Sequence, residues 1–207
     1  MSKKWIGIAM MLALCGCVLG NVRNGKQKQM QQDIAKEVIR LHVVANSDTE
    51  VDQQLKLEVK EEVVTLLREK MKQDDTVEKA ENTLRQQLPQ IEETATAYIQ
   101  KKGYDYEVKA ELGNCYFPIK EYGDMTFPAG EYKALKVNIG KSEGKNWWCV
   151  MYPTLCFVDS TYQIVPEESK EKLKKNLTEE EYQALLTGGE DVEYGLKIVD
   201  WIKGFGK

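Results

Sequence analysis

The sequence predicts an α+β fold, a single domain in which a mostly antiparallel sheet packs with two or three long helices. Apolar residues recur at helical spacing through the first half of the chain, and from Tyr104 onward the period changes to two. Helices early and strands later are typical of this class, and there is no internal repeat. With 207 residues and 42% hydrophobic content, the chain can bury an ordinary core.

The N-terminus has the pattern of a secretory signal. Lys3 and Lys4 precede an uncharged stretch, residues 5–20, and charge returns at Arg23. A membrane span needs about 20 apolar residues, so this stretch is short for one. We expect residues 1–20 to be a cleaved signal peptide, with a retained N-terminal membrane anchor as the first alternative and lipidation at Cys17 as the second. The rest of the chain should work outside the cytoplasm.

The glutamine-rich residues 21–32 are predicted to form a flexible stem, followed by an exported domain over residues 33–207. The domain begins with a strand at residues 39–44. Ser47 and Glu50 then have the spacing of a capping box, which predicts the start of a helix that runs to residue 72.

A second helical pattern starts at Thr76 and ends at Gly103, a residue typical of helix C-termini. Pro89 should kink this helix or split it in two. Alternation predicts strands at residues 106–110 and 132–139, and the latter should form an antiparallel hairpin with the strand WWCVMY, residues 147–152.

Residues 115–130, between those strands, contain two prolines, two glycines and four aromatics, which predicts an ordered loop with packed rings. Near the C-terminus, Thr178 and Glu181 form a second capping box for a short helix ending at Gly188 and Gly189. Residues 192–198 alternate and favour a closing strand.

Three cysteines follow the signal: Cys115, Cys149 and Cys156. An odd number leaves at least one thiol without a partner inside the chain. Cys149 and Cys156 flank Pro153, so a local reversal could join them in a disulfide; two buried thiols are the alternative. The spacing and one distant histidine do not make a zinc site, and we expect no metal and no cofactor.

His42 is the only imidazole, and Ser47, Asp48 and Asp52 lie near it in the sequence. A Ser-His-Asp arrangement would need Ser47, which is better used to cap the helix. The chain has no HExxH, GxSxG or glycine-rich phosphate loop. We therefore predict no catalytic residues, with His42 packed in its strand or bonded to a carbonyl.

Recognition of another protein is the better prediction. Trp147 and Trp148 are adjacent on one strand, so their rings should lie on opposite faces, one of them near solvent. Sealing a sheet edge is the alternative. A net charge of −4 without a basic cluster argues against a nucleic-acid partner.

Three blocks resemble the stage II sporulation protein R family of endospore-forming bacteria: IRLHVVANSDTEVDQQLKLEVKEEV (39–63), GNCYFPIKEYGDMTFPAGEYKAL (113–135) and NWWCVMYPTLCFVD (146–159). The resemblance covers residues 36–202. It implies export from the forespore into the space between the two sporulation membranes. It also implies activation of a membrane-embedded aspartic protease of the mother cell, stage II sporulation protein GA, which processes the sigma-E precursor. The resemblance carries over no catalytic residues.

We expect the partner to be the extracytoplasmic part of that protease, and the membrane to be touched only through the N-terminal segment. Tighter binding to one state of the protease would shift it towards its active assembly. Two alternatives are an exported hydrolase of the septal wall centred on His42 and a lipoprotein-type module that binds a small envelope ligand. The candidate contact residues are Asn46, Ser47, Asp48, Tyr122, Asp124, Phe127, Trp147 and Trp148.

Overall fold

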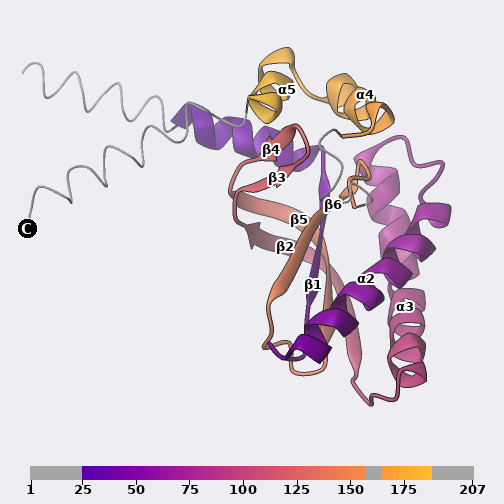
Figure 1. Ribbon diagram of the computed structural model, residues 1–207. Coiled ribbons are helices and arrows are strands. Elements are labelled where there is room, and N and C mark those ends of the chain that lie inside the picture. Colours follow the sequence, from indigo (N-terminus) through magenta and orange to yellow (C-terminus); the bar gives the residue numbers. More distant parts are fainter. Residues whose placement is uncertain (1–24, 157–164, 188–207) are drawn as a thin grey trace, which may run out of the picture.

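The computed structural model describes residues 25–156 and 165–187 (Figure 1). The predicted signal at residues 1–20, Cys17, Gly188 and Gly189, and the predicted strand at residues 192–198 lie outside these ranges. A helix takes in residues 25–36 ahead of the first strand. The elements that follow are β1 (Ile39–Val44), α2 (Glu50–Lys70), α3 (Val77–Lys101), β2 (Val108–Phe117), β3 (Lys120–Tyr122), β4 (Met125–Phe127), β5 (Gly130–Ile139), β6 (Asn146–Tyr152), α4 (Glu167–Asn176) and α5 (Glu179–Leu186).

The predicted α+β class is confirmed, because a mixed four-stranded sheet of order β2-β5-β1-β6 packs with helices. The predicted hairpin of β5 with β6 is wrong. β1 lies between them, parallel to β5 and antiparallel to β6. Every residue of β1 is buried, and a strand buried on both faces belongs inside a sheet.

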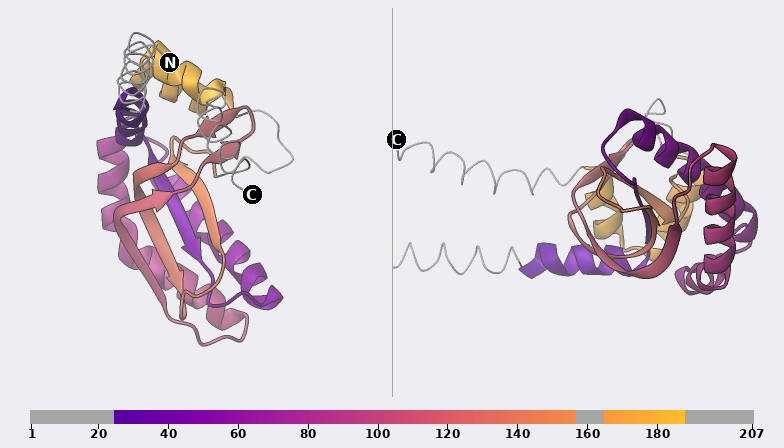
Figure 2. Two further views of the ribbon diagram at one scale, coloured as in Figure 1. Left: turned by 90° about the vertical axis from the view of Figure 1, so that its left-hand side faces the viewer. Right: turned by 90° about the horizontal axis from the view of Figure 1, so that it is seen from below.

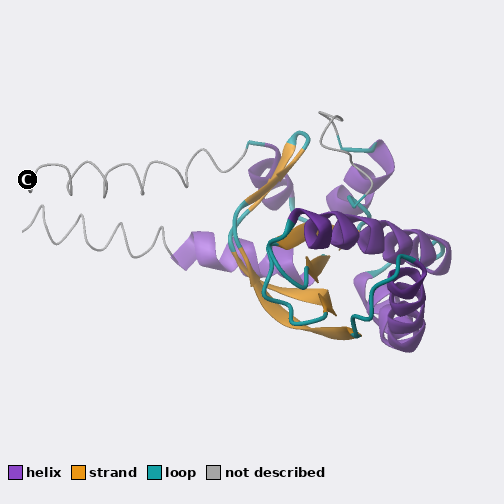
Figure 3. Cartoon of the chain, turned by 60° about the horizontal axis from the view of Figure 1, so that its bottom comes forward, coloured by secondary structure: helices purple, strands orange, loops and turns teal. Residues whose placement is uncertain are grey.

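One face of the sheet is covered by α2 and α3, which lie on the same side of it (Figures 1 and 3). α3 is a single helix although Pro89 lies inside it. Pro89 and Arg85, four residues earlier, are both exposed, so water can reach the carbonyl that loses its amide partner. Gly103, at φ +85, ends α3 as predicted, since its N–H donates to the Gln100 carbonyl.

The predicted capping box at the start of α2 is not formed. Thr49 is the N-cap residue instead, and its hydroxyl accepts the Asp52 N–H. The Ser47 hydroxyl donates to the Asp52 carboxylate, and its oxygen accepts the Thr49 N–H, so it lies in the turn before the helix and does not cap it. At α5, the predicted capping box of Thr178 and Glu181 is present in both directions.

The opposite face of the sheet is covered at one end only. In the left view of Figure 2 the strands lie in front of α2 and α3, while helix 25–36, the β3–β4 hairpin, α4 and α5 gather at one end. Residues 25–32, expected as part of a flexible stem, are helical here. Met30 and Ile34, one helical turn apart, pack in the hydrophobic cluster that contains Phe117, Phe127 and Tyr132, which accounts for the helix.

Three of the four rings in residues 115–130 are packed as predicted, Tyr116 being exposed, but the segment forms regular structure. β2 extends to Phe117, and β3 and β4 pair as a small antiparallel sheet. Phe117, Met125 and Phe127 are fully buried. This hairpin and helix 25–36 together close the covered end of the sheet face.

Candidate functional site

The turn after β1 uses its polar side chains internally. Ser47 and Asn46 donate to the Asp52 carboxylate at 2.5 and 2.8 Å. The Asn46 side-chain oxygen accepts the Lys141 N–H at 3.0 Å. Burial raises the pKa of Asp52, but the hydrogen bonds from Ser47 and Asn46 outweigh it and the pKa is lowered overall. These groups are therefore occupied in holding the turn.

The same turn clamps the loop between β5 and β6. Asp48 accepts the Lys145 N–H at 2.6 Å, and the Gly144 N–H donates to the Ala45 carbonyl at 3.0 Å. A Cβ at Gly144 would lie 2.2 Å from the Ser47 carbonyl oxygen, so only glycine allows this approach. Asp48 remains exposed and is the member of the predicted turn contacts that a partner reaches most easily.

Arg40, which sequence reasoning missed, lies at the centre of the covered end. It is fully buried, its Nε donates to the Cys149 carbonyl at 3.2 Å, and its Nη1 has no hydrogen-bond partner. Burial lowers its pKa. The sequence does contain one indication of this site, because an arginine stands inside IRLHVV, a run that is otherwise typical of a buried strand. Its guanidinium carbon lies 4.4 to 5.6 Å from the ring centroids of Phe117, Tyr132, Phe127 and Tyr122.

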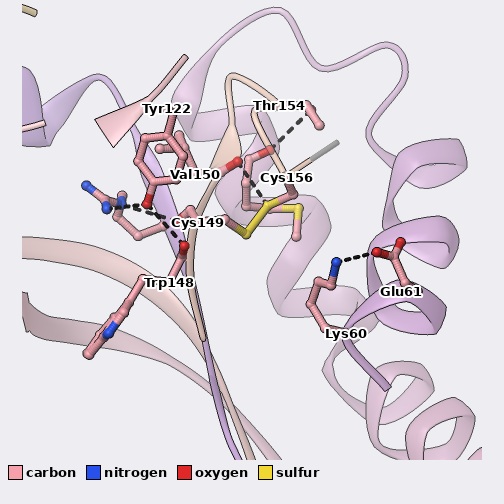
Figure 4. Close-up of a disulfide and its surroundings, with 10 residues drawn as sticks. Lys60, Glu61, Tyr122, Trp148, Cys149, Val150, Thr154 and Cys156 are labelled. Carbon is pink, nitrogen blue, oxygen red and sulfur yellow. Dashed lines mark hydrogen bonds and ion pairs between the residues drawn. A yellow bond between two sulfur atoms is a disulfide. The ribbon is translucent and has the colours of Figure 1, made fainter. Parts of the chain in front are cut away.

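Two predicted contact residues belong to this aromatic cage. The Tyr122 hydroxyl accepts from Arg40 at 2.9 Å and donates to the Trp148 carbonyl at 3.1 Å (Figure 4). Phe127 is fully buried, which places it in the core and not on a binding surface. Both rings therefore pack around Arg40 inside the domain and do not form the predicted contact surface.

Asp124, another predicted contact, holds α4 against the hairpin. It pairs with Lys170 at 2.6 Å and accepts the Val165 N–H at 2.9 Å. Burial raises its pKa, but the bonds from Lys170 and Val165 lower it overall. Its carboxylate is thus used within the domain.

The two tryptophans lie on opposite faces of β6. Trp147 packs against the α2–α3 side, with the Lys60 amine 4.8 Å from its ring centroid. Trp148 is half-buried on the other face and stacks on His42, with the centroids 3.9 Å apart and the rings inclined by 15°. Trp148 is therefore the predicted tryptophan that lies on the partly open face.

His42 has two hydrogen-bonding neighbours, and neither is in the predicted turn. Its Nε2 lies 2.8 Å from the Asn146 side-chain oxygen, and its Nδ1 lies 3.6 Å from the Cys115 sulfur. The ring is 7% exposed, and burial lowers its pKa. Ser47 is bonded to Asp52 instead, so the Ser-His-Asp arrangement considered from the sequence is not assembled.

Cys149 and Cys156 are joined by a disulfide, with their Cα atoms 5.4 Å apart (Figure 4). This separation lies within the usual range for a bridge. Cys115 is the free cysteine of the described residues and is half-buried. Those residues contain no cluster of three or more His, Cys, Asp or Glu side chains suited to a metal ion.

A surface groove, also missed by sequence reasoning, follows helix 25–36. Residues of that helix, the start of α3, the end of β2 and α5 line it. Tyr116, 60% exposed, and Ile119, 46% exposed, belong to its lining. With Val51 they are the large apolar side chains that the described residues expose. Exposed apolar residues beside a groove are typical of a protein-binding surface.

The fold and these features define an α+β domain whose sheet carries α2 and α3 on one face and is covered at one end of the other. None of the described helices has the length and apolar character needed to cross a membrane. The chain belongs to the stage II sporulation protein R family, whose model matches residues 35–162. Stage II sporulation protein R of Bacillus subtilis (strain 168) is 34% identical over 178 residues, covering 84% of this chain and 80% of that protein. No solved structure matches. The family gives the chain a role in sporulation.

Proposed function

We propose that this protein is an exported signalling protein that activates the membrane-embedded aspartic protease stage II sporulation protein GA, so that the sigma-E precursor is processed. Membership of the stage II sporulation protein R family carries the proposal. The basic and apolar pattern of residues 1–20 supports export into the space between the two sporulation membranes. The role is regulatory, and the chemistry of processing belongs to the protease.

The groove along helix 25–36 is the surface we propose for that contact. Tyr116 and Ile119 expose apolar surface there without burying it within the described chain. Aromatic side chains at the centre of a contact commonly supply much of its binding energy. Activation requires tighter binding to the active assembly of the protease than to the inactive one.

Co-expression with the protease and its precursor substrate tests the surface. Tyr116→Ala combined with Ile119→Ala should lower processing at least tenfold, since losing one hot-spot contact costs about 2 kcal/mol of binding. Val51→Ala is the matched control, because Val51 is 53% exposed but lies at the start of α2, outside the groove. Equal processing by both variants would remove the groove from the proposal.

A pulldown with the purified extracytoplasmic part of the protease tests the partner itself. The domain should be retained on that bait, and the double variant should be retained less. Absence of association, under conditions in which processing is reconstituted, would contradict direct activation.

A further inference from the structure

Three side chains that are far apart in the sequence meet on the partly open face of the sheet. His42 comes from β1, Cys115 from β2 and Asn146 from β6. β5 separates β1 from β2, and His42 pairs with Lys136 of β5 whereas Cys115 pairs with Tyr132. Ala134 lies between Tyr132 and Lys136 on the same face of β5. Its small side chain leaves room for the imidazole to reach the thiol diagonally across the strand.

The contacts of His42 determine which of its nitrogens carries the proton. Nε2 faces the side-chain oxygen of Asn146 at 2.8 Å, and an oxygen can only accept, so Nε2 is the protonated nitrogen. Nδ1 is then an acceptor, and it faces the Cys115 sulfur at 3.6 Å. The stacked ring of Trp148 restrains the imidazole plane. Asn146 thus orients a base towards a thiol.

We propose that Cys115, His42 and Asn146 form a centre for acyl transfer, with a thiol nucleophile, an imidazole base and an amide that orients the base. This is the arrangement that nucleophilic catalysis by cysteine requires. The sequence predicted no catalytic residues, and the Ser-His-Asp arrangement that was considered from it and set aside shares only His42 with this centre.

The reaction takes place in two balanced steps. The Cys115 thiol gives its proton to Nδ1 of His42 as the sulfur attacks a carbonyl carbon, and His42 then gives that proton to the departing amine or alcohol, which leaves a thioester on Cys115. In the second step, water gives a proton to Nδ1 and attacks the thioester. The carboxylic acid leaves, and the proton returns to the sulfur.

Burial determines the resting state of the pair. It raises the pKa of the Cys115 thiol and lowers that of the His42 imidazole. Both groups are therefore neutral before the substrate binds, and the proton moves during the attack. A preformed thiolate–imidazolium pair is not expected here.

The free edge of β2 provides a place for the substrate. β2 is an outer strand of the sheet in the described chain. The Ala110 N–H donates to the Glu92 side chain at 2.8 Å and so points away from β5. In an antiparallel pair this direction recurs at every second residue, so the amides of Asn114 and Tyr116 also point outward, on either side of Cys115.

An extended peptide that bonds to those two amides would lie along the strand that carries Cys115. The substrate class we infer is therefore the carbonyl of an extended peptide segment. Asn114 and Tyr116 also line the groove proposed for the protease contact, but the acylation of Cys115 is measured without the protease and does not depend on its activation.

Acylation by p-nitrophenyl acetate tests the centre in the purified full-length chain. We expect release of nitrophenolate, a gain of one acetyl group on Cys115 by mass spectrometry, and acylation faster than that of free cysteine. His42→Gln should slow acylation about 100-fold, the usual effect of losing a general base. Asn146→Ala should slow it about tenfold, since it removes only the orientation of the base.

Asn146 is exposed, so its replacement keeps the test valid even where His42→Gln fails to fold. Cys115→Ala should take up no acetyl group and marks the background. Acylation of Cys115 at the rate of free cysteine would overturn the proposal. So would an unchanged rate in a folded His42→Gln or Asn146→Ala variant.

Discussion

Arg40 and His42 lie two residues apart on β1 and on the same face of the sheet, but their surroundings differ. Arg40 lies under helix 25–36 and the β3–β4 hairpin, fully buried among four aromatic rings. His42 lies beyond that cover, and its neighbours Trp148, Cys115 and Asn146 are half-buried or exposed. Strand alternation gives the two residues the same direction. The extent of the cover therefore decides which part of the face is core and which is available for binding or chemistry.

Replacing Arg40 should have the largest effect. Arg40→Ala is expected to lower the free energy of unfolding by about 3–5 kcal/mol, because it empties the cage and leaves the Cys149 carbonyl without its donor. Arg40→Met fills the same space without a charge and should cost much less. Chemical denaturation measures both, and equal losses would show that charge, not packing, stabilises the cage.

Ile34→Ala tests whether helix 25–36 is the cover. Ile34 is 1% exposed, and its truncation should cost about 2–4 kcal/mol. Lys28→Ala, at an exposed position of the same helix, should cost less than about 0.5 kcal/mol. If neither variant changes stability, helix 25–36 does not cover this end of the sheet.

Trp148→Ala should have a smaller effect on stability, about 1–2 kcal/mol, because the ring is only half-buried. The sharper readout is the pKa of His42, measured by NMR on the only histidine of the chain. Burial holds this pKa below its ordinary value, so uncovering the imidazole should move it upward. Trp148→Phe, which keeps a stacked ring, should move it less. An unchanged pKa in Trp148→Ala would mean that the tryptophan does not shield the ring.

The pH dependence of His42 should give the smallest effect. The pKa of His42 is lower in the folded chain than in the unfolded chain, so the unfolded chain takes up the proton first as pH falls. The contribution of this group to stability is present above about pH 6.5, the unfolded pKa, and is lost as pH falls towards the folded pKa. Denaturation from pH 8 to pH 5 should show a decline in wild type that is weaker in His42→Gln. Parallel curves would contradict the buried, neutral imidazole.

Local patterns predicted most of the elements. The strand at residues 39–44, the two long helices, the start of the second at Thr76, the cap at Thr178 and the helix end at Gly103 all follow from spacing and from single-residue preferences. They were predictable because each depends on neighbours within a few residues. The opposite orientation of Trp147 and Trp148 follows from the same short-range geometry of a strand.

The failures have a different origin. Ser47 has the spacing of a cap, but its hydroxyl is drawn to Asp52 because that buried carboxylate needs donors. β5 and β6 are neighbours in the sequence, but β1 enters between them because it is buried along its whole length. The first error came from a nearby competitor for the Ser47 hydroxyl, and the second from treating adjacency in the sequence as contact in space.

The sequence by itself determined the family, the α+β class and most of the helices and strands, because these are carried by contiguous blocks and local periodicity. Only the tertiary structure decided that Arg40 lies in an aromatic cage and that His42 meets Cys115 and Asn146, which are 73 and 104 residues away from it. Such meetings depend on strand order, register and the small side chain of Ala134 between them. These contacts form only when the whole sheet packs against its helices, so no local sequence pattern predicts them.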